Sequence, residues 1–231
     1  MIRTSRKVLE MKKILLSSIL LGTSLFADDI RSGVFATAGI GYGTSTVHMK
    51  AAPTADEWAK FNEAGLAKSG TARVFQIGYD AVIRRVLLGG FLHVGQIGGR
   101  KIQINTTKYA STLFSTDIAS TSNTFTIKNS FGYGGFLRAG FLPTPTSLFY
   151  TGIGAIWSTR KITGDEGAIS KRVLSPALTA GVETALFGKV SLGVSGMFSF
   201  PVLARKTIPV GKIKWTNNDA AVLLNLTYRM S

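Results

Sequence analysis

Apolar residues alternate with small or polar residues along most of the chain after residue 33. The segment at 190–200 shows the pattern most clearly, because Val190, Leu192 and Val194 are separated by serine and glycine. Alternation with a period of two places one residue type on each face of a β-strand. We therefore predict eight strands, at about residues 33–47, 71–83, 86–99, 123–141, 148–162, 171–186, 190–203 and 216–229.

Short and long connections alternate between these predicted strands. The short connections are Arg84 and Arg85, residues 143–147, and residues 187–189. The longer and more polar connections cover about residues 48–70, 100–122, 163–170 and 204–215. An even number of antiparallel strands, with short turns at one rim and long loops at the other, is typical of an outer-membrane β-barrel.

The two faces of the predicted strands differ in the size of their side chains. One face carries residues such as Phe75, Ile77 and Tyr79, and the opposite face is mostly glycine, serine and threonine. The second set is too small and too rarely charged for a solvated exterior, so we assign it to a crowded, mildly polar lumen. We predict an all-β, eight-stranded antiparallel up-and-down transmembrane β-barrel. A soluble eight-stranded ligand carrier is the main rival.

The first long loop has the pattern of a short helix. Its sequence PTADEWAKFNEAGLAK (53–68) places Thr54 and Glu57 at capping-box spacing. Trp58 and Phe61 fall on one side of the expected helix. They either pack as a lid on the barrel rim or contact a ligand or host surface.

The N-terminus predicts export. Met11 and two lysines precede the apolar run ILLSSILL (14–21), and Ala27 stands at the expected cleavage point. A basic segment, a short apolar run and a small residue are the parts of a signal peptide. We assign residues 1–27 to a signal peptide, with Met11 as an alternative start, and residues 28–231 to the barrel domain.

This combination of signal peptide and alternating strands over residues 28–231 resembles the small outer-membrane barrels of Gram-negative bacteria, of the outer membrane protein A, protein X and opacity-protein type. The resemblance implies insertion into the outer membrane by the barrel assembly machinery, and we expect a monomer. Members of these families commonly end in an aromatic residue, whereas this chain ends in Ser231, with Tyr228 as its last aromatic residue.

Residues for catalysis or metal binding are few. The chain has no cysteine and two histidines, His48 and His93, with no serine at a telling spacing from either. Some barrels that this chain resembles are acylhydrolases or acyltransferases acting on lipid A, which need histidine, serine and an acidic residue together. We expect no metal site, no cofactor and no enzymatic activity, and we keep a lipid A-modifying enzyme as an alternative.

Four charged residues are predicted to face the lumen near the short-turn rim. They are Asp80, Arg138, Glu183 and Arg229. Unpaired ions in so narrow a space would cost several kcal/mol each. We predict that Arg138 pairs with Glu183, and that Asp80 and Arg229 extend the network and plug the barrel.

Basic residues recur at the loop-side ends of the predicted strands. They are Arg73, Arg100, Lys101, Lys128, Arg160, Lys161, Lys171, Arg172, Arg205, Lys206, Lys212 and Lys214. Scattered bases, within a formal charge of +15, do not indicate nucleic-acid binding. We predict that this rim contacts the phosphates of lipopolysaccharide in the outer leaflet.

The predicted function is therefore that of a non-enzymatic outer-membrane barrel with a structural or surface-interaction role. Its expected partners are membrane lipid, lipopolysaccharide and a host or surface ligand for the loops. A narrow, gated, porin-like channel is an alternative, because an eight-stranded barrel is just wide enough to be filled by its own side chains.

Overall fold

Ten β-strands make up the regular structure of this computed structural model, which describes residues 29–52, 64–97, 101–105, 124–164, 167–202, 204–208 and 211–230. The strands are β1 (Gly33–Ala52), β2 (Ala64–Ile83), β3 (Val86–Gln96), β4 (Lys101–Asn105), β5 (Thr124–Thr144), β6 (Ser147–Gly164), β7 (Gly167–Phe187), β8 (Val190–Ser199), β9 (Ala204–Ile208) and β10 (Gly211–Met230).

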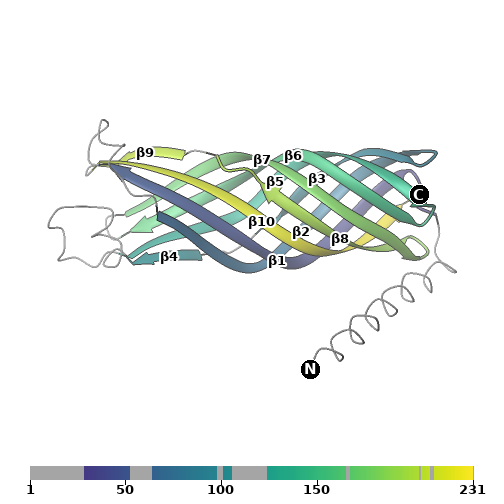
Figure 1. Cartoon of the computed structure of the whole chain (residues 1–231), viewed down its shortest axis with the longest axis horizontal. Helices are drawn as coiled ribbons and strands as arrows, with labels where there is room; N and C mark the ends of the chain where they lie inside the picture. Colours follow the sequence, from purple (N-terminus) through teal and green to yellow (C-terminus); the bar gives the residue numbers. More distant parts are fainter. Residues whose placement is uncertain are drawn as a thin grey trace, which may run out of the picture.

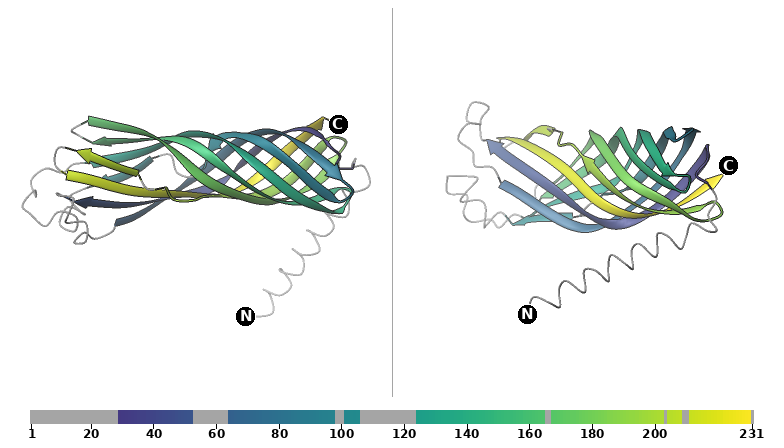
Figure 2. Two further views of the ribbon diagram at one scale, coloured as in Figure 1. Left: turned by 90° about the horizontal axis from the view of Figure 1, so that it is seen from above. Right: turned by 45° about the vertical axis from the view of Figure 1, so that its right-hand side comes forward.

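All the strands belong to one antiparallel sheet that closes on itself. The order is β1-β2-β3-β5-β6-β7-β8-β10, and β10 pairs again with β1. The short strand β4 pairs with β5 beyond the end of β3. In the same way, β9 pairs with β10 beyond the end of β8. The result is an elongated barrel whose strands wrap obliquely around its long axis (Figures 1 and 2). The predicted eight-stranded barrel is confirmed.

Tight turns join the strands at one rim, where the C-terminal end of β10 also lies (Figure 1). The β2–β3 turn contains Arg84 with φ of 58°, and the β7–β8 turn contains Gly188 with φ of 47°. These are left-handed conformations, which glycine adopts readily and arginine does not. We call the opposite rim the loop-side rim.

The two faces of the barrel wall differ as the alternation predicts. On β8, Leu192 and Val194 are exposed on the outside, whereas Ser191 and Ser195 are buried inside. The same contrast on the other strands gives the barrel an apolar exterior, whereas the interior mixes polar side chains with large apolar ones such as Phe91. In water such an exterior is unfavourable, but against lipid chains it is the expected surface. The protein is a β-barrel of the outer membrane.

The strands run further toward the loops than the alternation predicts. β6 and β7 pair as far as Gly164 and Gly167, so most of the predicted loop at 163–170 is strand. Residues 204–215 likewise contain β9 and the start of β10. Beyond the membrane neither face of a strand must be apolar, so the sequence signal ends before the strand does.

The predicted helix at 53–68 is wrong in its last part, because residues 64–68 begin β2. The rest of that segment, with Trp58 and Phe61, and the predicted signal peptide lie outside the described residues. Within the described residues, no helix has the length and apolar character needed to cross a bilayer.

Candidate functional site

The four charged residues predicted for the lumen meet in one ion network. Arg138 donates to both carboxylate oxygens of Asp80, with its Nε 2.7 Å from Oδ1. Arg229 donates from Nη1 to Asp80 Oδ2 at 2.7 Å and from Nη2 to Glu183 Oε1 at 2.8 Å. All four residues are at most 5% exposed. Asp80 is therefore the shared acceptor of both arginines.

The pairing within the network differs from the prediction, in which Arg138 pairs with Glu183. In the structure, Arg138 forms a salt bridge with Asp80, and Glu183 forms one with Arg229. The register explains the choice, because Asp80 and Arg138 both lie directly opposite Gly89 on β3. A Cβ atom at Gly89 would collide with Asp80 Oδ1, so the glycine leaves room for the two charges to meet.

Aromatic and aliphatic side chains cover the network on both sides. The Cζ of Arg138 lies 4.0 Å from the centre of the Phe35 ring and 5.1 Å from that of Tyr150. Toward the loops, an apolar cluster lies in the lumen: Phe35, Phe91, Phe136, Ile156, Ala177 and Met197. Toward the short turns lies a second cluster: Ile30, Leu87, Leu142, Leu148 and Ala185. The ion network thus lies between two apolar clusters along the barrel axis.

The short-turn mouth is narrowed by the segment that precedes β1. The backbone N–H of Ile30 donates to the carbonyl of Pro145 at 2.8 Å, and the Ile30 side chain is 4% exposed. Ser32 Oγ accepts from the backbone N–H of Val82 at 2.7 Å. These contacts tie residues 30 and 32 to two different short-turn hairpins across the mouth.

The two histidines lie in different environments. His93 is buried in the lumen with its ring centre 5.9 Å from that of Phe136 in an edge-on contact. His48 lies near the loop-side end of β1, opposite Thr216 and Gly65. Among the residues that the structure describes, no group of three or more His, Cys, Asp or Glu side chains could hold a metal ion.

Three basic residues lie together on the outer wall near the loop-side rim; we call Lys128, Lys161 and Arg172 the outer basic cluster. All three are exposed. Lys128 on β5 lies directly opposite Lys161 on β6, and Lys161 lies opposite Ser170, two residues from Arg172 on β7. In the described part of the chain none of the three forms a salt bridge. Like charges placed opposite each other on neighbouring strands destabilise a sheet unless an anion compensates them.

A β-bulge puts Lys128 on the outer wall. Between Asn129 and Gly132, β5 has one more residue than β6. This extra residue reverses the alternation, so Lys128 faces outward although Gly132 and Arg138 face the lumen. Bulges often re-aim a side chain in this way.

Aromatic rings lie next to the outer basic cluster. The Tyr133 and Trp157 rings are stacked with their centres 6.0 Å apart, and both side chains are exposed on the outer wall. The Cζ of Arg172 lies 5.6 Å from the centre of the Tyr133 ring. Tyrosine and tryptophan prefer the membrane–water boundary, so these rings mark the edge of the apolar belt.

The sequence predicts Arg160 on the outer rim, and this prediction is wrong. Arg160 lies inside the barrel. Its side chain is 2% exposed, and its Nη2 lies 3.8 Å from Asp219 Oδ2. Asp219 also accepts from Ser45 Oγ, and its backbone N–H donates to Ser199 Oγ at 3.0 Å. Arg160 follows the inward parity of Ile156 on β6, whereas Lys161, one residue later, faces outward.

The other predicted rim residues are spread around the loop-side end. Arg73 is exposed on the outer wall, but it lies midway along β2, nine residues from the loop-side end of that strand at Ala64. The remaining described ones are Lys101 on β4, Lys171 on β7, Arg205 and Lys206 on β9, and Lys212 and Lys214 on β10. Arg100 lies outside the described residues.

No family model matches the sequence, and no curated protein matches it either. The fold is similar to Neisserial surface protein A at 10% identity, over 86% of this chain and 98% of that one, with a TM-score of 0.46. It is similar to the Yersinia pestis attachment invasion locus protein Ail, in complex with the heparin analogue sucrose octasulfate, at 12% identity, 85% and 99% coverage and a TM-score of 0.42. It is also similar to the Escherichia coli outer membrane protease OmpT at 10% identity, over 87% of this chain and 99% of that one, with a TM-score of 0.45.

Proposed function

We propose that this protein is a non-enzymatic surface barrel that binds the phosphates of lipopolysaccharide through the loop-side rim of its outer wall. The observation that carries the proposal is the outer basic cluster, where exposed cations lie side by side at the edge of the apolar belt. Lipid A phosphates lie at this depth of the outer leaflet. Charge-assisted hydrogen bonds to phosphate would offset the repulsion between Lys128 and Lys161.

The chemistry of the cluster fits a phosphorylated lipid better than plain solvation. Arg172 offers a planar fork that binds phosphate through two hydrogen bonds, and the lysines add point charges beside it. Their aliphatic stems can lie along the apolar wall while the charged ends reach the headgroup layer. Tyr133 and Trp157 provide the flat apolar surface on which such a headgroup rests.

The test compares the stability of the barrel with and without lipopolysaccharide. Replacing Lys128, Lys161 and Arg172 together by glutamine should reduce the stabilisation by lipopolysaccharide, and leave the unfolding midpoint in neutral detergent nearly unchanged. The fraction of folded barrel can be followed by its migration on a gel without boiling. Substituting an exposed charge that has no partner changes the free energy of unfolding by about 0.5 kcal/mol or less, so little change is expected in neutral detergent.

A charge-matched control uses the opposite rim. Replacing Arg31, Arg84 and Arg85, all exposed, by glutamine removes the same three charges from the short-turn side. This control should keep the full effect of lipopolysaccharide. Equal losses in both variants, or a loss that is the same in neutral detergent, would refute the proposal.

A further inference from the structure

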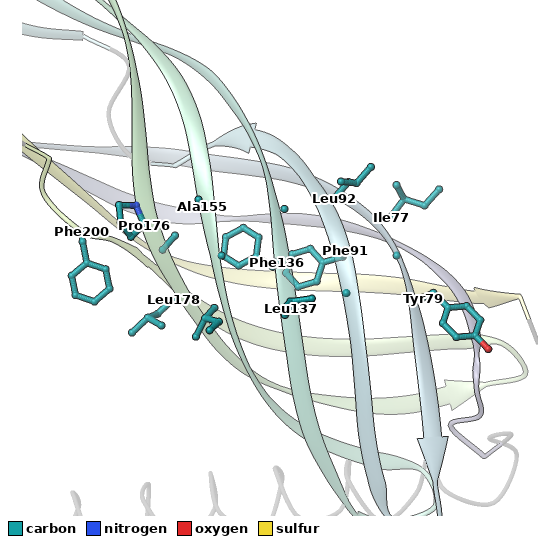
Figure 3. Close-up of a pocket in the computed structure, with 16 residues that line it drawn as sticks. Ile77, Tyr79, Phe91, Leu92, Phe136, Leu137, Ala155, Pro176, Leu178 and Phe200 are labelled. Carbon is teal, nitrogen blue, oxygen red and sulfur yellow. The ribbon is translucent and has the colours of Figure 1, made fainter.

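An apolar groove lies on the outer wall of the barrel, across strands β2, β3, β5, β6 and β7 (Figure 3). It measures about 970 Å³. Its floor is made of small residues, because Gly135, Ala155 and Pro176 lie directly opposite one another on three neighbouring strands. Its walls include Leu92 and Leu137, which are 67% and 70% exposed and therefore stand out from the wall. The groove faces lipid, not the lumen.

The groove runs down the wall from the loop side toward the short turns. Phe200, at one end, directly follows the loop-side end of β8. Tyr79, at the other end, lies four residues before the end of β2 at Ile83. Figure 3 shows Pro176 and Phe200 together at one end and Ile77 and Tyr79 at the other. An extended chain in this groove would therefore lie across the leaflet, in the direction of lipid acyl chains.

The loop-side end of the groove leads to the outer basic cluster. Pro176, Leu174 and Arg172 are successive outward residues of β7, so the groove ends about 13 Å along the strand from Arg172. In the row above the floor, Tyr133 lies opposite Trp157, which lies opposite Leu174. From the membrane interior toward the loop-side rim, strands β5, β6 and β7 thus carry the apolar groove, then aromatic rings, then cations.

From this arrangement we infer that the outer wall over β5–β7 is a binding site for one lipid A molecule, with its phosphates on the outer basic cluster and one acyl chain in the groove. The inference rests on the proposed function and adds a defined place for the lipid. Within a membrane an acyl chain gains little by leaving other chains, so shape and packing must hold it in the groove. The charges fix the headgroup, and therefore the start of the chain, directly above.

Two outward glycines allow a matched test. A Cβ atom at Gly135, in the groove floor, would come no closer than 4.0 Å to any atom outside its neighbours, and the same distance holds at Gly196 on β8, outside the groove. Large side chains at both positions can therefore point into lipid without disturbing the wall. Gly135→Phe would fill the groove, and Gly196→Phe would add the same bulk elsewhere.

The experiment counts lipid A molecules retained by the purified barrel in detergent, by native mass spectrometry. Wild type and Gly196→Phe should retain lipid A equally, and Gly135→Phe should retain about fivefold less, because the packing of one chain is lost. The wild-type barrel should not retain lipid A whose phosphates have been removed. Gel migration without boiling shows whether each variant is folded. If Gly135→Phe does not fold, Gly135→Leu replaces it in the experiment.

The outcomes separate this inference from the proposed function. If the Lys128, Lys161 and Arg172 variant loses lipid A but Gly135→Phe does not, the groove is overturned and the basic rim stands. If neither variant loses lipid A, both are overturned. If wild type is a dimer and Gly135→Phe is a monomer with unchanged lipid A retention, the groove holds a second copy of the chain and the inference is overturned.

Discussion

Inside the barrel each arginine of the ion network faces a carboxylate of the protein, whereas on the outer wall Lys128 faces Lys161. The inner charges are nearly inaccessible and the outer ones are exposed. A buried charge must carry its counter-charge within the fold, because desolvation would otherwise cost several kcal/mol. An exposed cation can take its counter-charge from the surroundings. The same residue types therefore stabilise the fold in one place and are available for binding in the other.

Adjacent residues show how small the structural difference is. Arg160 and Lys161 are neighbours on β6, yet the first lies in the lumen beside Asp219 and the second on the outer wall. Strand β5 makes the same exchange through its bulge, which separates outward Lys128 from inward Arg138. A shift of one residue moves a charge from the interior to the surface.

The largest effect is expected from Asp80→Ala. This change leaves Arg138 and Arg229 with Glu183 as the remaining carboxylate of the network. Breaking a buried ion pair by removing one partner costs about 3–5 kcal/mol. Urea unfolding in neutral detergent, followed by gel migration, measures the loss. Asp29→Ala removes an exposed carboxylate next to the same mouth and should change little. A similar stability for both variants would show that the network contributes nothing to folding.

Arg138→Ala should have a smaller effect on stability, because Asp80 keeps its bond to Arg229. The truncation also removes a side chain from the lumen, so single-channel conductance in planar bilayers should rise above that of wild type. Arg138→Met removes the charge and keeps most of the volume. It should be destabilised as well but should conduct less than the alanine variant. Equal conductance of the two variants would show that Arg138 does not occlude the lumen.

The smallest effect is expected from Tyr133→Leu, which removes the aromatic ring near Arg172. A cation–π contact at an exposed site contributes about 0.5–1 kcal/mol. Because this contact lies within the protein, the unfolding free energy should fall by this amount in neutral detergent. It should fall further with lipopolysaccharide, because Arg172 is then held less firmly beside the phosphate. Tyr228→Leu makes the same change near the short turns and is the control. Equal losses in both media would show that Tyr133 acts on the fold alone.

The barrel could be predicted from sequence because its signal repeats along every strand. On β8 the signal is clearest, with Leu192 and Val194 outside and Ser191 and Ser195 inside. The pairing partner of Arg138 could not be predicted in this way, because alternation gives the face of a residue but not the stagger between strands. A usable signal was Gly89, whose missing side chain makes space between Asp80 and Arg138.

The outer rim was predicted only in part, for two physical reasons. The inward position of Arg160 follows from the parity of Trp157 and Ile156, so the alternation on β6 already contained this information. The outward position of Lys128 does not follow from parity, because the bulge after it reverses the alternation. A bulge depends on how two strands pair and leaves no clear mark in either strand alone.

The pairing of β1 with β10 makes the barrel a ring without a first strand. Val34 pairs with Met230 and Ala52 with Lys212, so the seam is as long as any internal hairpin. Both ends of the described chain lie at the short-turn rim, where Lys189 also occupies an exposed turn. A circularly permuted chain that begins at Lys189 and links the old ends would give every strand the same neighbours. The order in which the strands are synthesised and the order in which they stand around the ring are therefore separate properties of this protein.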